Sequence, residues 1–355
     1  MDKYLSVKLR VISFFLIVLV IFLHAYNLPL EKHTGNTILH QGYSSYVQYF
    51  FTQGITRVAV PLFFAISGYL FFLGITGKRD EFLIKMKKRL KTIAIPYLLW
   101  SLAGLLFNYI LQQFPFSRRF FTHKLFADYS ATELLHTIFI DPVPYQLWFL
   151  RDLIVLVVLS PVLFLLVRYL KYFLLLFLLV IWGIRIDLVM LSNEALLFFV
   201  FGAFLSIQHI EIGYSKLVRP SGLLFTLWIA LIVCKMLLIS VMIKNPLMLN
   251  LLHKMSVLVG VAAVWGIYDK LFGNKDLSGT RLYYISGFSF FLYAFHEPML
   301  MMVKKAGFVV AGKGEPATLL IYFLVPIIII ASGTTIAGLL KNKAPGLYHV
   351  VTGGR

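Results

Sequence analysis

Ionisable side chains interrupt several apolar stretches of this 355-residue sequence. One of them is His24, which follows an apolar run that begins at Val11. Charged and titratable groups are costly inside a lipid bilayer, so those that occur there face a cavity or a partner and often serve function. The others that share this unusual placement are Arg57, Arg151, Asp152, Lys235, His253, His296 and Glu297. Imidazole, carboxylate and guanidinium groups can transfer protons and stabilise developing negative charge.

A structural role competes with a chemical one for each of these residues. A lone histidine in a spanning segment can be a hydrogen-bonded packing residue, and His253 suits that role because it lies beside Lys254 near the start of a helix. Arg151 and Asp152 are adjacent, and neighbours on a helix point about 100° apart. We therefore expect these two side chains to form structural ion pairs with other helices rather than with each other.

A basic segment occupies residues 78–100 and runs into an apolar helix. It contains the cluster Lys87, Lys88, Arg89 and Lys91. One interpretation is a topology signal that contacts anionic lipid headgroups. The alternative is an anion site for a phosphorylated cytosolic molecule such as a coenzyme A thioester, because these side chains form charge-assisted hydrogen bonds to phosphate.

The composition indicates a polytopic membrane protein. Hydrophobic residues make up 60% of the chain and charged residues only 14%. The net charge of +18 falls in short runs between apolar segments, which argues against nucleic-acid binding. The single cysteine, Cys234, excludes an intrachain disulfide and a thiolate metal cluster, so we expect no metal and no redox chemistry.

Apolar runs near the roughly 20 residues needed to cross hydrocarbon predict an all-α bundle of about ten transmembrane helices. The predicted spans are residues 9–28, 55–76, 92–113, 147–168, 172–190, 194–210, 221–242, 249–272, 282–304 and 316–340. We interpret the first as a retained helix rather than a signal peptide, because no small-residue cleavage site follows it. Because no linker in the sequence is long or polar enough to separate a soluble domain, we expect residues 1–355 to form a single membrane domain.

The basic residues set the predicted orientation. Lysine and arginine gather before the first span, after the second, fourth, sixth and eighth, and at the end of the tenth. Positively charged loops stay in the cytoplasm, so both termini are predicted to be cytoplasmic. The segments at residues 29–54 and 114–146 are longer, aromatic-rich and nearly balanced in charge. They are predicted to lie on the outer face, above His24, where a substrate would meet the protein.

A set of motifs resembles the membrane acyltransferase family 3. The motifs occur in that family's order and cover nearly the whole chain: "RVISFFLIVLVIFLHAYN" from Arg10, "VPLFFAISGYLFF" from Val60, "KKRLKTIAIPYLLW" from Lys87, "QLWFLRDL" from Gln146, "FFVFGAFLS" from Phe198 and "SGFSFFLYAFHEPML" from Ser286. Any one of them is merely an aromatic-rich apolar helix. Their combination in order is specific.

The resemblance implies an enzyme of the bacterial cytoplasmic membrane that moves an acyl group, often acetyl, from cytosolic acyl-CoA to a carbohydrate hydroxyl at the outer face. It also implies that His24 is the catalytic histidine. The family's arginine, eleven positions earlier, is replaced here by Ser13, and the nearest arginine is Arg10. Arg10 lies about 21 Å below His24 along an ideal helix and about 40° round it, so it either partly replaces the missing arginine or anchors the helix.

Our mechanistic hypothesis makes neutral His24 the general base that takes the proton of an acceptor hydroxyl. Lys87, Lys88, Arg89 and Lys91 would hold the coenzyme A phosphates. Either Asp152 or Glu297 would orient the imidazole. Arg57, Arg151 and His296 would line the cavity or stabilise the oxyanion.

Other interpretations stay open. In a covalent variant His24 or Ser67 carries the acyl group, although Ser67 also suits close helix packing beside Gly68. A polytopic transporter or flippase would also have many helices and intramembrane charges, but we find no evident pair of interrupted repeats. A sensor or assembly partner could bind glycan through the outer loops without catalysis.

Overall fold

The computed structural model describes residues 2–28, 42–118, 121, 124–184, 191–214, 216–241, 245–273 and 275–354, and throughout these ranges the regular structure is helical. In the first half the helices are α1 Lys3–His24, α2 Tyr43–Tyr49, η1 Phe50–Gly54, η2 Ile55–Val58, α3 Ala59–Phe72, α4 Arg79–Gln113, α5 Pro115–Arg118, η3 Phe126–Asp128, α6 Ala131–Phe139, η4 Tyr145–Leu147, α7 Trp148–Val158 and α8 Ser160–Leu170. The second half contains α9 Tyr172–Ile184, α10 Asn193–Ile207, η5 Lys216–Val218, α11 Ser221–Ser240, α12 Pro246–Phe272, α13 Arg281–Ser286, α14 Ser289–Ala311, α15 Glu315–Lys343 and α16 Pro345–Thr352.

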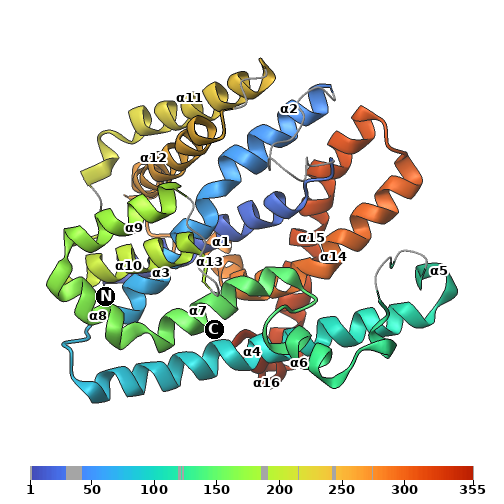
Figure 1. The fold of residues 1–355 in the computed structure, drawn as a ribbon, viewed down its shortest axis with the longest axis horizontal. Helices are drawn as coiled ribbons and strands as arrows, with labels where there is room; N and C mark the ends of the chain where they lie inside the picture. Colours follow the sequence, from blue (N-terminus) through green and yellow to red (C-terminus); the bar gives the residue numbers. More distant parts are fainter. Residues whose placement is uncertain are drawn as a thin grey trace.

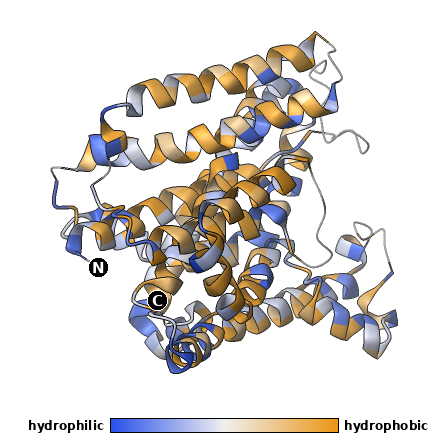
Figure 2. Cartoon of the chain, turned by 60° about the vertical axis from the view of Figure 1, so that its left-hand side comes forward, coloured by the Kyte–Doolittle hydropathy of each residue, from blue (hydrophilic) through white to orange (hydrophobic). Residues whose placement is uncertain are grey.

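The long apolar helices make this a multi-pass membrane protein. Within the described ranges, six helical segments are long and apolar enough to cross a membrane: Lys3–His24, Tyr43–Phe72, Arg79–Gln113, Ser221–Ser240, Pro246–Phe272 and Glu315–Lys343. Figure 2 shows hydrophobic residues along most turns of the helices, with hydrophilic residues mainly towards helix ends and loops. A helix satisfies its backbone hydrogen bonds within its own segment while its side chains face lipid, which explains this architecture.

The predicted ten spans correspond to helices with different lengths and breaks. The interval 147–168 holds two helices, α7 and α8, which meet at an angle of 68°. Pro161 lies in the first turn of α8, where its lack of an N–H is tolerated. The apolar helices α9 and α10 are shorter than a full span. The total of ten therefore stays a prediction.

The predicted loops also differ from the structure. Part of the interval 29–54 is helical, because α2, η1 and η2 run continuously into α3 as one segment of 30 residues. Residues 29–41 of that interval, and residues 185–190 of the predicted fifth span, lie outside the described residues. The interval 114–146 contains the short helices α5, η3, α6 and the start of η4.

Helix α1 lies in the middle of the bundle, with α11 and α12 on one side and α4 on the other (Figure 1). Asp2 caps its start by accepting a hydrogen bond from the N–H of Leu5 at 2.6 Å. Lys8 is fully buried and pairs with Asp269 of α12 at 2.7 Å. Its ammonium also donates to the carbonyl of Gly213 and lies 4.0 Å from the ring centre of Trp265. These contacts fix the first half of α1 against α12.

Two glycines bring α3 and α10 into close contact. A Cβ on Gly68 would lie 2.1 Å from the carbonyl oxygen of Phe199, and a Cβ on Gly202 would lie 1.9 Å from that of Ala65. Any side chain would force the helices apart, which is the usual reason for small residues at helix contacts in membranes. Ser67, next to Gly68, is only partly buried.

Helix α14 is interrupted near its middle. Glu297 has non-helical backbone angles, φ −109° and ψ 136°, and Pro298 follows it. Proline cannot donate a backbone hydrogen bond and disfavours helical angles in the residue before it. The interruption turns the backbone at Glu297 within an otherwise apolar helix.

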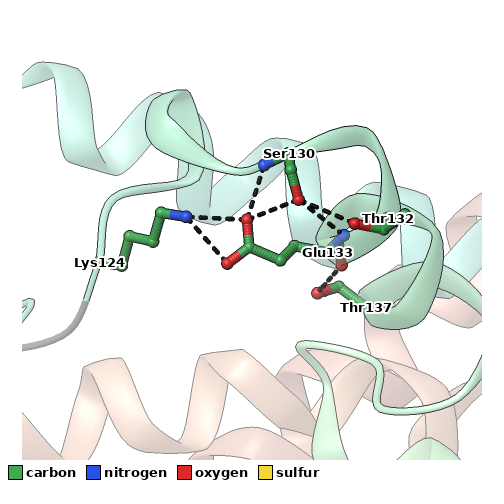
Figure 3. A network of polar contacts seen from close by, with 5 residues as sticks. All are labelled: Lys124, Ser130, Thr132, Glu133 and Thr137. Atoms are coloured by element: carbon green, nitrogen blue, oxygen red, sulfur yellow. Dashed lines mark hydrogen bonds and ion pairs between the residues drawn. The ribbon is translucent and has the colours of Figure 1, made fainter.

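A polar network stabilises the start of α6 outside the candidate spans (Figure 3). Lys124 donates to both carboxylate oxygens of Glu133 at 2.8 Å. Ser130 caps the helix and exchanges hydrogen bonds with Glu133 in a capping box. The hydrogen bonds from Lys124 and Ser130 lower the pKa of Glu133 to about 2. This segment of the predicted outer region is thus ordered by local charge and capping.

Candidate active site

His24 is the last residue of α1, and two other rings hold its imidazole. The hydroxyl of Tyr145, in η4, lies 2.7 Å from Nδ1 of His24. On another side the ring of His296, in α14, stacks on it with centroids 5.4 Å apart and an angle of 22° between the planes. Within the described residues, Nδ1 of His24 has the Tyr145 hydroxyl as its hydrogen-bond partner, whereas Nε2 makes no hydrogen bond to the protein.

Glu297 and Lys304 add charge around this histidine. The Tyr145 hydroxyl is also 3.4 Å from Oε1 of Glu297, so Tyr145 connects the carboxylate to the imidazole. The ammonium of Lys304 donates to the backbone carbonyls of His24 at 3.2 Å and Tyr26 at 2.9 Å. A cation at the carbonyl end of a helix is electrostatically favourable, so Lys304 stabilises the end of α1 that carries His24.

Two atoms in this cluster are buried without a hydrogen-bond partner among the described residues. They are Nε2 of His296 and Oε2 of Glu297. Nδ1 of His296 lies 3.2 Å from the carbonyl of Leu292 and must donate to it, so Nε2 carries the lone pair. Unpaired buried polar atoms are costly and are commonly found where function requires them.

A cavity of about 570 Å³ extends along α1 from its N-terminal half to His24. Its α1 lining consists of Arg10, Ser13, Val20, Leu23 and His24. The fourteen positions between Arg10 and His24 correspond to about 21 Å of helix. The volume falls within the range that small-molecule sites occupy, roughly 300–1,000 Å³.

Three cations line the end of the cavity that is remote from His24: Arg10 of α1, Arg89 of α4 and Lys341 of α15. The guanidinium of Arg10 lies 4.2 Å from the ring centre of Tyr283. A Cβ on Gly287 would come within 2.2 Å of that guanidinium, so a larger residue there would require the Arg10 side chain to move. Lys341 lies 5.8 Å from the ring centres of both Tyr284 and Phe288.

The charge of these three residues is not neutralised by carboxylates in the part of the chain that is described. The ion pairs found there involve other residues, and Nε of Arg10 is buried without a hydrogen-bond partner. Between this cationic mouth (Arg10, Arg89 and Lys341) and His24, the lining is mainly apolar and aromatic, including Phe63, Phe149 and Phe290. Ser67 also lines this part. The cavity can therefore receive an elongated ligand with an anionic end and an apolar arm.

The predicted pair Arg151 and Asp152 is arranged differently from our expectation. Arg151 folds back onto its neighbour, with Nη2 3.0 Å from Oδ1 of Asp152, and it also donates to the carbonyl of Ile140. The prediction of ion pairs with other helices was therefore wrong. The flexible arginine stem overcomes the 100° offset, and the other Asp152 oxygen accepts the N–H of Ser192 at the start of α10.

The remaining predicted residues fall into two groups. His296 and Glu297 lie beside His24, whereas Arg57 donates hydrogen bonds to Thr52 and Gln53 and is absent from the cavity lining. Of the basic cluster, Arg89 lines the cavity, while Lys87, Lys88 and Lys91 are exposed and do not. Lys235 lies 5.4 Å from the ring centre of Tyr49, and His253 is in α12, both outside the lining.

Sequence reasoning missed three residues of the site. Tyr145 directly precedes the "QLWFLRDL" motif, but as one tyrosine in an aromatic-rich loop it gave no signal. Lys304 is the last residue of the predicted ninth span, and Lys341 belongs to the basic residues at the end of the tenth, so neither stands out as a site residue. Among the described residues, no group of three or more His, Cys, Asp or Glu side chains is arranged to hold a metal ion.

Comparisons with known proteins agree with the geometry. The family model described as "Acyltransferase domain", that of acyltransferase family 3, matches residues 8–338. The succinoglycan biosynthesis protein ExoH of Rhizobium meliloti (strain 1021) is 27% identical over 372 residues, which cover 100% of this chain and 94% of that protein. No solved structure matches this chain. The chain belongs to acyltransferase family 3 and is an acyltransferase of the membrane.

Proposed function

We propose that residues 1–355 act as one O-acyltransferase domain, which transfers an acetyl group from cytosolic acetyl-CoA to a hydroxyl of an exported or surface carbohydrate. The observation that carries this proposal is the cavity, which connects the cationic mouth of Arg10, Arg89 and Lys341 to the imidazole of His24. The family assignment favours this enzyme over a transporter or flippase.

The cationic mouth suits the phosphates of coenzyme A. Arginine binds phosphate through paired N–H donors and lysine binds it as a point charge. Arg10 and Ser13 both line the cavity, which supports a role for Arg10 in place of the family arginine. The apolar stretch beyond the mouth would hold the pantetheine arm. Lys87, Lys88 and Lys91 are exposed and would raise the local donor concentration from the cytosolic surface.

His24 is the general base of the proposed reaction. Nε2 takes the proton of the acceptor hydroxyl as the oxygen attacks the thioester carbonyl, and a tetrahedral intermediate forms. The carbon–sulfur bond then breaks, and the imidazolium returns the proton to the thiolate, so that the products are the acetyl ester and free coenzyme A. Holding both substrates beside Nε2 makes the step effectively unimolecular.

A carbohydrate acceptor is supported by the name of the relative, a succinoglycan biosynthesis protein. The acceptor would reach His24 from the side opposite the cationic mouth. In the proposed orientation both termini and the mouth face the cytoplasm of a bacterium, and His24 lies towards the outer face of its cytoplasmic membrane. The gathering of basic residues at one end of the predicted spans supports this orientation.

The test uses purified full-length protein in liposomes, radiolabelled acetyl-CoA and a surface-glycan extract. Wild-type protein should transfer label to glycan. His24→Ala should reduce transfer by about 10²-fold or more, the loss expected for a general base. His136→Ala is the matched control, because His136 is exposed in α6 and outside the cavity.

Equal amounts of folded protein in the three samples, measured by size-exclusion chromatography, exclude misfolding as the cause. Transfer by His24→Ala at the wild-type rate would refute the proposed role of His24. Failure of wild-type protein to label any glycan while it releases free coenzyme A would refute the proposed acceptor class.

A further inference from the structure

Tyr145 occupies a position between the two groups that could exchange a proton with it. Its hydroxyl lies 2.7 Å from Nδ1 of His24 and 3.4 Å from Oε1 of Glu297. Hydrogen bonds at catalytic sites are often long without substrate and shorten in the complex, so the longer distance is compatible with a relay. A hydroxyl has one proton to donate and can accept at its oxygen.

The chemistry of these three groups determines the direction of the hydrogen bonds. With Glu297 ionised, its carboxylate only accepts, so it receives the proton of the Tyr145 hydroxyl. The Tyr145 oxygen then accepts, and Nδ1 of His24 must be the protonated nitrogen. Neutral imidazole carries one proton, which leaves the lone pair on Nε2. The reverse direction would place two unprotonated oxygens against each other, those of Tyr145 and Glu297.

The backbone around Tyr145 is fixed to α14, which carries Glu297. The side-chain amide of Gln146 donates to the backbone carbonyls of Ala294 and Glu297, each at 3.3 Å. In return the hydroxyl of Tyr293 donates to the carbonyl of Gln146 at 2.7 Å. Because η4 is bonded to α14 from both sides, the Tyr145 ring keeps a fixed position relative to Glu297.

The end of α1 is held in the same way. Lys304 of α14 donates to the carbonyl of His24. The stacked ring of His296, also on α14, restricts rotation of the imidazole plane. Helix α14 therefore holds both partners of the Tyr145 hydroxyl, although they come from segments more than a hundred residues apart.

We propose that Tyr145 is a positioning residue, which holds His24 in the Nδ1-protonated tautomer and couples it to Glu297. The lone pair on Nε2 then faces the substrates. When Nε2 takes the acceptor proton, the Tyr145 oxygen and the Glu297 carboxylate stabilise the positive imidazolium. The kinetic part of this inference rests on the proposed function of His24 as the base, whereas the tautomer does not.

The tautomer is measured directly on full-length protein labelled with ¹⁵N-histidine in detergent. Long-range proton–nitrogen correlation spectra distinguish Nδ1–H from Nε2–H, and the His24 signals are those missing in His24→Gln. Wild-type protein should show the Nδ1–H form. Tyr145→Phe should populate the Nε2–H form. Glu297→Gln should keep Nδ1–H, because the amide oxygen still accepts from Tyr145.

Kinetics with acetyl-CoA and the glycan extract test the functional part. Tyr145→Phe should lower kcat by roughly tenfold to a hundredfold, as loss of an orienting partner usually does, with an unchanged KM for acetyl-CoA. Glu297→Gln should lower kcat while the tautomer stays. The control is Tyr97→Phe, which loses a hydrogen bond of 2.9 Å to Phe139 outside the cavity and should keep wild-type kcat.

An Nε2–H tautomer in wild-type protein would overturn the inference even if Tyr145→Phe failed to fold. Wild-type kcat in a folded Tyr145→Phe would overturn its functional part. By contrast, full activity of His24→Gln would refute the proposed function of His24 as the base. The tautomer measurement would then be the remaining test of whether Tyr145 positions His24.

Discussion

The two ends of the α1 cavity are built in different ways. At the His24 end, hydrogen bonds and ring stacking from η4 and α14 fix the side chain at defined distances. At the other end, Arg10 and Lys341 rest on aromatic faces and have no carboxylate partner among the described residues. Hydrogen bonds and ring contacts therefore organise the His24 end, whereas several unneutralised positive charges characterise the cationic mouth.

This difference suits the two tasks of the proposed reaction. Proton transfer depends on an atom being within a few tenths of an ångström of its target, which requires a rigid surrounding shell. Attraction of a polyanion depends on charge that acts over a distance and tolerates side-chain movement. Changes at the His24 end should therefore alter kcat, whereas changes at the cationic mouth should alter KM for the donor.

The largest expected effect comes from breaking the buried Lys8–Asp269 ion pair, which holds α1, the helix that carries residues of both ends, against α12. Asp269→Asn leaves the fully buried Lys8 charge without its partner, and loss of one member of a buried pair costs about 3–5 kcal/mol of stability. We expect a lower melting temperature in detergent, together with impaired kcat and KM. The double variant Lys8→Met, Asp269→Leu removes both charges and should recover most of the stability.

Unchanged melting of Asp269→Asn would contradict the structural role of the pair. If only KM changed in that variant, the two ends would not depend on a common rigid helix, and our comparison would need to be revised.

An intermediate effect is expected at the cationic mouth. Arg10→Ala and Arg89→Ala should each raise KM for acetyl-CoA about tenfold, because a hydrogen bond to a charged group contributes about 1.5–3 kcal/mol and tenfold in affinity is 1.4 kcal/mol. Neither should change kcat by more than about threefold. Lys87→Ala removes a neighbouring exposed charge outside the cavity, so it should raise this KM less than Arg89→Ala does. Equal KM changes for Lys87 and Arg89 would show that the exposed cluster, not the cavity, binds the donor.

The smallest expected effect lies at the exposed Lys124–Glu133 network. Hydrogen bonds from Lys124 and Ser130 hold the pKa of the Glu133 carboxyl at about 2, below the usual value of about 4.3. The carboxylate therefore contributes stability above about pH 4.3, and this contribution is lost as the pH falls towards 2. Glu133→Gln should flatten the melting temperature over this window and leave kcat unchanged at neutral pH, since exposed ion pairs contribute little. A large loss of activity at neutral pH would connect this network to the site.

The helical character and the main site residues were predictable from local sequence. Apolar runs of spanning length predict helices, because a helix satisfies its backbone groups within its own segment and needs no partner in lipid. His24 stands out because an ionisable group at the end of such a run is unusual. The break between α7 and α8 was missed, since hydropathy averages over a window and does not register a bend at Pro161.

The assembly of the site could not be read from spacing. Arg10, Arg89 and Lys341 come from three distant helices and meet only through tertiary packing. Tyr145 acquires its importance from the backbone interruption at Glu297, a feature that no local pattern specifies in space. The pairing of Arg151 with Asp152 was also not predictable from spacing. The two residues point about 100° apart on an ideal helix, but the flexible arginine side chain bends back to reach its neighbour.

A single helix, α1, carries both Arg10 and His24, so the distance between the two ends of the cavity is fixed. The two side chains are separated by about 21 Å of helix rise. A donor can occupy both ends only if its anionic group and its reactive carbonyl are separated by a comparable reach. Compact acyl donors such as acyl phosphates are too short to bridge that span, so in the proposed reaction the length of α1 alone would select against them before any contact with the acyl group is made.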